Sequence, residues 1–181
     1  MRKKIGLKYA AKKYFGWLLV AAIAIAFVPA TSAQQTSIKK TSSQYINRLL
    51  PEAQRIQKEY GIPLDITLAI ARQESGNGDY VIGKGNHFGL RCASDDCITL
   101  EKNGRLIEYE TCPDVSECFN IFAESIKDLV EDDPMTLNRI YQKGYATSPH
   151  WVERVKTIRE EVRQTLSEAG IEYRSPSKKN N

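Results

Sequence analysis

One segment constrains the fold of this chain more than any other: an apolar helix followed directly by a glycine-rich loop. Pro63 opens the helix, because a proline in the first turn loses no needed donor, and apolar residues occupy most of its faces up to Glu74. A helix that is apolar nearly all round is buried, so other elements must cover it. Five glycines then follow between Gly76 and Gly89, a density that no regular element tolerates. The sequence therefore predicts a central helix with a long loop lying against it.

The elements that cover this helix are predicted from apolar periodicity. Apolar residues at three- and four-residue steps predict four more helices, over about 45–60, 119–130, 137–141 and 151–162. Pro51 marks a bend or a fresh first turn. Between residues 98 and 109, two extended runs flank Asn103-Gly104, the preferred dipeptide of a type I′ hairpin turn. The prediction is an α+β domain, mainly helical, with one small β-hairpin lobe.

The first 33 residues have the layout of an export signal. A basic start without any acid precedes the apolar run Phe15–Val28, and short side chains follow up to Ala33. The run has 14 residues, whereas a transmembrane helix needs about 20. We therefore expect a signal peptide over 1–33, cleaved after Ala33, rather than a permanent membrane span, and a periplasmic or extracellular location.

The charge balance argues against a nucleic-acid partner. The whole chain carries a formal net charge of +4, but without residues 1–33 there remain 20 basic and 22 acidic residues. Such a domain lacks the positive field that nucleic-acid binding requires. For the rest of the chain we expect a flexible polar leader over 34–43, a monomeric catalytic domain over 44–167 and a polar tail over 168–181.

Four clustered cysteines predict two disulfides in an exported protein. They are Cys92, Cys97, Cys112 and Cys118, and three pairings are open. A zinc site is the alternative, but the C-x4-C and C-x5-C spacings are looser than the usual C-x2-C, and neither histidine belongs to a closely spaced ligand pair. We expect structural bridges, with no metal and no cofactor.

Glu74 is the residue whose position suggests chemistry. Burial against the apolar helix and the negative end of the helix dipole both disfavour its ionised form and raise its pKa. A carboxylic acid that stays protonated near neutral pH can donate the proton that the leaving oxygen needs when a glycosidic bond breaks. A solvated glutamate at a helix end is the alternative interpretation.

Several motifs in a fixed order decide between these interpretations. They are Leu50-Pro51-Glu52-Ala53, Glu59-Tyr60-Gly61-Ile62, Leu68-Ala69-Ile70-Ala71-Arg72-Gln73-Glu74-Ser75-Gly76, Asn86-His87-Phe88-Gly89-Leu90 and Gly144-Tyr145-Ala146-Thr147-Ser148-Pro149. In this order, over about 45–162, the chain resembles the glucosaminidase family of peptidoglycan hydrolases, glycoside hydrolase family 73. The resemblance implies a lysozyme-like fold, a groove between an α-lobe and a β-lobe, and peptidoglycan glycan strands as substrate.

The resemblance also implies roles for individual residues. Glu74 would be the general acid, and Tyr145 would place its hydroxyl at the reaction centre. Asn86, Phe88 and Gly89 would form the groove floor: the amide would contact substrate, the ring would stack on sugar or pack in the core, and the glycine would allow close backbone approach.

The family resemblance further implies a second carboxylate on the hairpin. Glu101 is our candidate among Glu101, Glu108 and Glu110, because it precedes the turn, and it faces Leu106 if the turn has two residues. A separation of about 5–5.5 Å between the two carboxyls would indicate a retaining mechanism and about 6.5–9.5 Å an inverting one. The absence of a partner would favour assistance by the acetamido group of the substrate.

Some residues depart from the family pattern. Asn77 stands where relatives commonly carry an aromatic residue, Ser148 takes the place of the usual aspartate of the tyrosine motif, and Cys112 and Cys118 replace a tyrosine and a serine.

The function that we predict from the sequence is that of an exported endo-β-N-acetylglucosaminidase that cuts after GlcNAc. The alternatives are a lytic transglycosylase that leaves anhydro-muramyl ends and a peptidoglycan-binding module with little catalysis.

Overall fold

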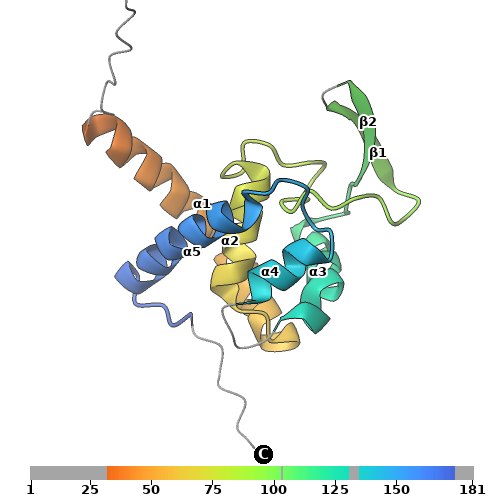
Figure 1. The fold of residues 1–181 in the computed structure, drawn as a ribbon. Helices are drawn as coiled ribbons and strands as arrows, with labels where there is room; N and C mark the ends of the chain where they lie inside the picture. Colours follow the sequence, from red (N-terminus) through yellow and green to blue (C-terminus); the bar gives the residue numbers. More distant parts are fainter. Residues whose placement is uncertain (1–31, 103, 131–134, 174–181) are drawn as a thin grey trace, which may run out of the picture. The chain divides into compact units, whose positions relative to one another are not determined.

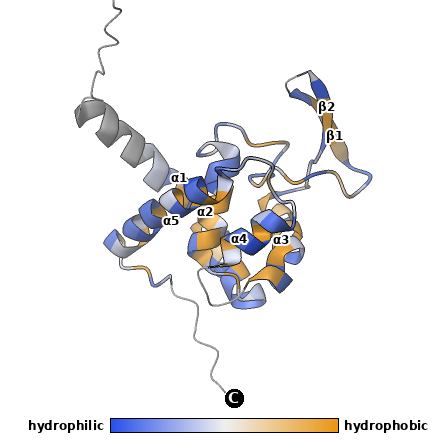
Figure 2. Cartoon of the chain, in the orientation of Figure 1, coloured by the Kyte–Doolittle hydropathy of each residue, from blue (hydrophilic) through white to orange (hydrophobic). Residues whose placement is uncertain are grey.

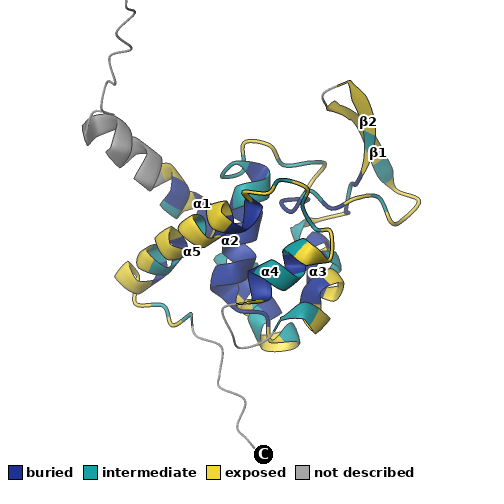
Figure 3. Ribbon diagram, viewed as in Figure 1, coloured by how far each residue is buried: buried dark blue, intermediate teal, exposed yellow. Residues whose placement is uncertain are grey.

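Helix α2 (Leu64–Ser75) lies at the centre of the helices in the computed structural model, as its apolar sequence predicts (Figure 1, Figure 3). Ten of its 12 residues are buried, and it packs against α1 (Ser32–Tyr60) and α5 (Trp151–Glu168). The helix ends at Gly76, whose φ of +58° is the left-handed conformation that commonly closes helices. The structure describes residues 32–102, 104–130 and 135–173.

Helix α1 corrects one expectation. Residues 34–43 belong to α1 rather than to a flexible leader. Of the two alternatives predicted at Pro51, a bend or a fresh first turn, the continuous helix excludes the second. The polar segment contains no proline or glycine that would stop a helix, and extending an existing helix adds one hydrogen bond per residue fixed. Positions 1–31 of the predicted signal peptide lie outside the described residues. None of the helices in the described ranges is both long and apolar enough to cross a membrane.

Three further helices complete the core: α3 (Val115–Ile126), η1 (Lys127–Leu129) and α4 (Thr136–Gln142). Of these, α3 packs against α1 and α4 packs against α5. Asp114 caps α3 by accepting a hydrogen bond from Glu117 N at 2.9 Å. Helix α3 carries apolar residues along its length (Figure 2). Among them, Phe119 and Phe122 are buried in the core. The predicted third and fourth helices are therefore present, with the third beginning four residues earlier than its first predicted apolar residue.

The hairpin has the predicted register. Strand β1 (Cys97–Lys102) pairs antiparallel with β2 (Arg105–Glu110), and Lys102 pairs with Arg105, so the connection has two residues. The strands are largely exposed (Figure 3). Their base is joined to the preceding loop by hydrogen bonds from Cys92 N to Glu108 O and from Glu110 N to Leu90 O.

The C-terminal segment differs in part from the expected polar tail over 168–181. Helix α5 ends at Glu168, and beyond it Ile171 and Tyr173 pack against the core. Arg163 lies over the ring of Tyr173, 5.7 Å from its centroid. Residues 174–181 lie outside the described part of the chain.

Candidate active site

Glu74 lies in the last turn of α2 and is half-buried. Its Oε1 accepts a hydrogen bond of 2.6 Å from the indole nitrogen of Trp151, the first residue of α5. Burial raises the pKa of Glu74, and the Trp151 hydrogen bond and the charges of Lys102 and Arg154 oppose this rise. The net direction is upward, as the sequence predicts for a proton donor.

Tyr145 lies beside this acid. Its ring is 5.5 Å from that of Trp151, and its hydroxyl donates a 2.9 Å hydrogen bond to the carbonyl oxygen of Phe88. Burial, followed by the charge of Glu74, raises the pKa of Tyr145 well above its ordinary value. The phenol is therefore neutral, its proton is committed to Phe88, and its oxygen lone pairs remain available to accept a hydrogen bond.

Asn86 does not line the groove as expected. It is 1% exposed, its amide nitrogen donates to the carbonyls of Leu90 and Glu110, and its Oδ1 accepts from the backbone nitrogens of Phe88 and Leu90. Its bonds close the 86–90 turn and tie it to β2 across 24 residues. Asn86 is thus a structural residue, because its amide groups are already satisfied within the protein.

Phe88 and Gly89 have different positions relative to the site. The Phe88 ring is 1% exposed and stacks on Phe122 at 4.0 Å, so it belongs to the core rather than to a sugar-binding surface. Gly89 has a φ of +64°, and a Cβ at this position would lie 3.8 Å from Glu74 Oε2. The backbone of Gly89 therefore lies beside Glu74, and its close approach to a substrate stays a prediction.

Glu101 lies on the hairpin face opposite to that of Lys102, and its role as second carboxylate stays a prediction. Glu101 is exposed and pairs with Leu106, as the two-residue turn predicts. The hairpin charge that acts on Glu74 is that of Lys102, the next residue along β1. Adjacent side chains of a strand point to opposite faces, so Glu101 belongs to the face that Lys102 does not share.

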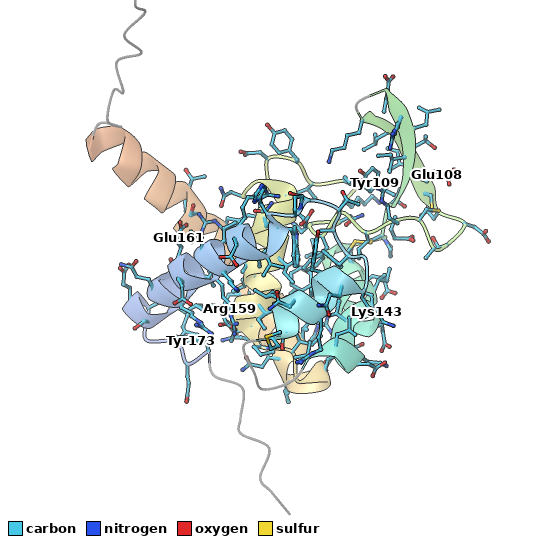
Figure 4. All side chains as sticks on the ribbon, viewed as in Figure 1. Glu108, Tyr109, Lys143, Arg159, Glu161 and Tyr173 are labelled. Carbon is cyan, nitrogen blue, oxygen red and sulfur yellow. A yellow bond between two sulfur atoms is a disulfide. The ribbon has the colours of Figure 1, made fainter. Side chains whose placement is uncertain are left out.

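The hairpin carries two other carboxylates. Glu108, which lies on β2 (Figure 4), pairs with Thr99 and therefore shares a strand face with Glu101. Glu110 is 3% exposed, and it accepts hydrogen bonds from Ser94 Oγ at 2.5 Å and from Ala93 N at 3.1 Å. The pKa of Glu110 is lowered, and the hydrogen bond from Ser94 is the main cause. Glu110 therefore holds the loop before β1 as a carboxylate rather than acting as a second acid.

The cysteines form the two predicted disulfides, and the structure decides the pairing. Cys92 bonds to Cys97 and Cys112 bonds to Cys118. The first bridge closes the loop that precedes β1, and the second joins the end of β2 to α3. In the described ranges, no cluster of three or more His, Cys, Asp or Glu side chains could hold a metal ion.

Two departures from the family pattern have structural explanations. Asn77 has a φ of +63°, a conformation that asparagine tolerates better than most residues, and its Oδ1 accepts from Arg72 Nε at 2.6 Å and from Ser42 Oγ at 3.4 Å. It therefore connects α1 to the end of α2. Ser148 accepts a 3.0 Å hydrogen bond from Arg154, which bears one of the two charges acting on Glu74.

Trp151 is the site residue that sequence reasoning missed as a functional group. Its place in an i, i+4 apolar pattern with Val155 identifies it as a core residue, and it is indeed 2% exposed. The available signal was its position two residues after Pro149, at the end of the tyrosine motif. A buried indole normally finds an acceptor for its N–H, and here that acceptor is Glu74.

Comparison with known proteins identifies the class. The family model described as mannosyl-glycoprotein endo-beta-N-acetylglucosaminidase, named Glucosaminidase, matches residues 50–164. A peptidoglycan hydrolase from Sphingomonas sp. A1 is 17% identical and has a TM-score of 0.62, covering 73% of this chain and 97% of its own. The glycoside hydrolase domain of Salmonella typhimurium FlgJ is 16% identical with a TM-score of 0.57, covering 71% and 92%. No curated protein matches the chain.

A third similar structure is a type VI secretion system effector-immunity complex from Pseudomonas protegens, 21% identical with a TM-score of 0.59, covering 70% of this chain and 94% of that one. The fold, with its acid at the end of the central helix, is that of the lysozyme-like glycoside hydrolases. More particularly, the chain belongs to the glucosaminidase family.

Proposed function

We propose that this protein is an exported endo-β-N-acetylglucosaminidase that hydrolyses the glycan strands of peptidoglycan after GlcNAc. The observation that carries the proposal is Glu74: a half-buried carboxyl with a raised pKa, in contact with Trp151 and next to Gly89 and Tyr145. Family membership supports the glycosidase chemistry, and the peptidoglycan hydrolases among the similar structures support the substrate. The two disulfides support passage into an oxidising compartment.

The first step of the proposed reaction is proton donation by Glu74. The carboxyl proton moves to the glycosidic oxygen as the bond from that oxygen to the anomeric carbon of GlcNAc breaks. Burial keeps the carboxyl of Glu74 protonated to a higher pH than the carboxyl of an exposed glutamate. Glu74 can therefore act as a proton donor over a wider range of pH. Glu74 then removes a proton from the water that completes hydrolysis, which restores the acid.

Tyr145 supports this step without changing its own charge. Its hydroxyl donates to Phe88, so the phenol oxygen faces the reaction as an acceptor. It can accept from the acetamido N–H or from the attacking water, and a neutral phenol beside the anomeric carbon does not compete with Glu74 for the proton.

The nucleophile that we propose is the acetamido oxygen of the substrate. Glu101 and Lys102 are adjacent on β1, so their side chains lie on opposite faces of the hairpin. Lys102 is the hairpin residue whose charge acts on Glu74. Attack of the acetamido oxygen on the anomeric carbon forms a cyclic oxazolinium while the leaving oxygen takes the proton of Glu74. Water opens this ring, and the acetamido group is regenerated.

The direct test is the Glu74→Gln variant. Because loss of a positioned acid typically removes about 10²–10⁴-fold of the rate, release of soluble fragments from purified sacculi should fall by that factor. Far-UV circular dichroism should remain as in the wild type, since glutamine has the same shape. A folded variant that keeps most of its activity would show that the proton donor lies elsewhere.

The companion variant Glu101→Gln tests the nucleophile. Substrate assistance predicts activity within about threefold of the wild type, because an exposed strand residue outside the reaction centre contributes little. A loss comparable to that of Glu74→Gln would instead make Glu101 the second carboxylate. Rescue of that activity by azide, with formation of a glycosyl azide, would identify its role as a nucleophile or base.

Mass spectrometry of the muropeptide products tests the bond and the reaction type. Hydrolysis after GlcNAc leaves reducing GlcNAc ends. A lytic transglycosylase, which uses a single helix-end glutamate, leaves anhydro-muramyl ends, so those ends would overturn the proposal. Binding to sacculi without release of fragments would instead support a binding module.

A further inference from the structure

We propose that Trp151 positions the general acid: its indole N–H occupies Oε1 of Glu74 and thereby directs the carboxyl proton to Oε2, the oxygen next to Gly89. The inference rests on the proposed function, and it adds a residue and an assignment of the proton to one atom of the acid.

The two oxygens of Glu74 have different surroundings. Oε1 accepts the 2.6 Å hydrogen bond from Trp151. Oε2 lies 3.8 Å from the position of a Cβ at Gly89, and in the described part of the chain it is the only atom within 4 Å of that position apart from the neighbours of Gly89. One oxygen is therefore engaged with the protein, and the other borders open space.

The chemistry of the indole determines where the proton lies. An indole N–H is a donor only, so the oxygen that it contacts must act as an acceptor. A protonated carboxyl has one O–H, and its carbonyl oxygen is a stronger acceptor than its hydroxyl oxygen, so the indole N–H favours Oε1 as the carbonyl oxygen. The proton consequently resides on Oε2, where a glycosidic oxygen could approach over a glycine that has no side chain.

The surroundings of Trp151 hold the indole rigidly in place. The side chain is 2% exposed, its ring stacks with Tyr141 at 6.5 Å between centroids, and it tilts against Tyr145 at 5.5 Å. Its backbone N–H donates to the carbonyl of Ser148 at 3.0 Å, which fixes the start of α5. An acid held by such a group stays within the narrow range of geometry that proton transfer requires.

The electrostatic setting of the acid includes charges from two other positions. Lys102 on β1 and Arg154 on α5 both favour the carboxylate of Glu74, as does the Trp151 hydrogen bond, whereas burial favours the neutral acid. The Tyr145 hydroxyl, whose pKa is raised by burial and by the charge of Glu74, is neutral. Removing the indole donor therefore raises the pKa of Glu74 further and leaves the other contributions in place.

The first test does not depend on activity. The full chain contains two tryptophans, Trp151 and Trp17, which lies in the expected signal peptide, so the Trp151 indole signal in a ¹⁵N–¹H spectrum is assigned by its loss in Trp151→Phe. We expect this signal to move with pH as Glu74 ionises and to lose that pH dependence in Glu74→Gln. A Trp151 signal that is independent of pH in the wild type would overturn the inference whatever the enzyme does. An intact titration in a chain that releases no fragments would overturn the proposed function alone.

The second test separates positioning from packing. Trp151→Phe should lower kcat by about tenfold or more with KM within about twofold, because the lost interaction aligns the acid rather than binding substrate. The alkaline limb of the pH profile should move to higher pH. Tyr141→Leu, which loosens the packing of Trp151 but keeps the indole N–H, should lower kcat less than Trp151→Phe does and should leave the pH profile unchanged. Equal losses in both variants would show that Trp151 acts only through packing.

Discussion

Burial disfavours the charged form of both Glu74 and His87. It raises the pKa of Glu74, and it lowers the pKa of His87 to about 4. His87 is linked through Tyr45 to Ser75, the residue after Glu74, because the Tyr45 hydroxyl lies 2.8 Å from Ser75 Oγ and 3.0 Å from His87 Nδ1. Glu74 thus keeps its proton to a higher pH than an exposed glutamate, and the neutral ring of His87 supports the end of α2.

The neutral state of His87 predicts a loss of stability in mild acid. The unfolded chain protonates this ring below its ordinary pKa of 6.5, whereas the folded protein protonates it only near 4. Between these values the unfolded state binds more protons, so the contribution of His87 to folding is lost as the pH falls through this window. After a discount for solvent screening, we expect a difference of about 2 kcal/mol.

Urea unfolding at pH 7 and pH 4 measures this effect, with His87→Gln as the matched control. The wild type should lose more stability than the variant over this interval, since carboxylates elsewhere titrate in both. Equal losses would mean that the ring of His87 is already charged in the folded state.

At the scale of elements, the two disulfides fasten the hairpin from both sides. Cys92–Cys97 closes the loop before β1, and Cys112–Cys118 joins the end of β2 to the first turn of α3. Cys112 and Cys118 are buried, whereas Cys92 and Cys97 are partly exposed. The second bridge therefore combines a covalent link with buried sulfur atoms in the core.

Alanine replacement of each pair should show this difference. Both loops are short, so constraint of the unfolded chain contributes about 2 kcal/mol for each bridge. The Cys112→Ala/Cys118→Ala variant should lose more than this, because it also removes buried contacts, and the Cys92→Ala/Cys97→Ala variant should lose no more. Denaturant unfolding compares them. Equal destabilisation would show that the burial of the sulfurs contributes nothing.

An intact mass provides the control for these variants. The nonreduced wild type should be about 4 Da lighter than the reduced form, and each double variant about 2 Da lighter than its own reduced form. Four titratable thiols in the exported protein would contradict both bridges.

At the scale of the whole described domain, a buried ion pair joins the central helix to α5. Asp65 is 1% exposed, and its Oδ2 accepts from Arg159 Nε and Arg163 Nε, each at 2.7 Å; Figure 4 shows Arg159 on α5. Arg72 at the other end of α2 pairs with Glu161 at 2.7 Å. Since α5 also carries Trp151, this docking sets the distance between the acid and its partner.

Asp65→Asn should destabilise the protein by about 3–5 kcal/mol, because two guanidinium groups would lose their buried anion. Glu160→Gln, which removes an exposed partner of Arg163, should cost about 1 kcal/mol or less. Thermal unfolding distinguishes the two. A similar small effect in both variants would show that water compensates the arginines and that the pair does not hold α5.

Properties that depend on neighbours in the sequence were predictable. Helical periodicity located α2 and the elements that cover it, the two-residue Asn-Gly turn set the pairing of Glu101 with Leu106, and an acid at an apolar helix end implied the raised pKa of Glu74. Each rests on spacing within a few residues, so no long-range contact was needed.

Contacts between distant residues required the tertiary structure. The indole of Trp151 donates a hydrogen bond to Glu74, 77 positions away in the sequence. Asn86 donates to Glu110, 24 positions away, and so has a structural role in place of the expected contact with substrate. The pairing of the four cysteines likewise follows from how the elements meet. The sequence alone determined which local elements form and which acid lies at the end of α2. Only the packing of α5 and the hairpin around that end decided what surrounds the acid, because burial and hydrogen-bond partners depend on residues that come together in the folded chain.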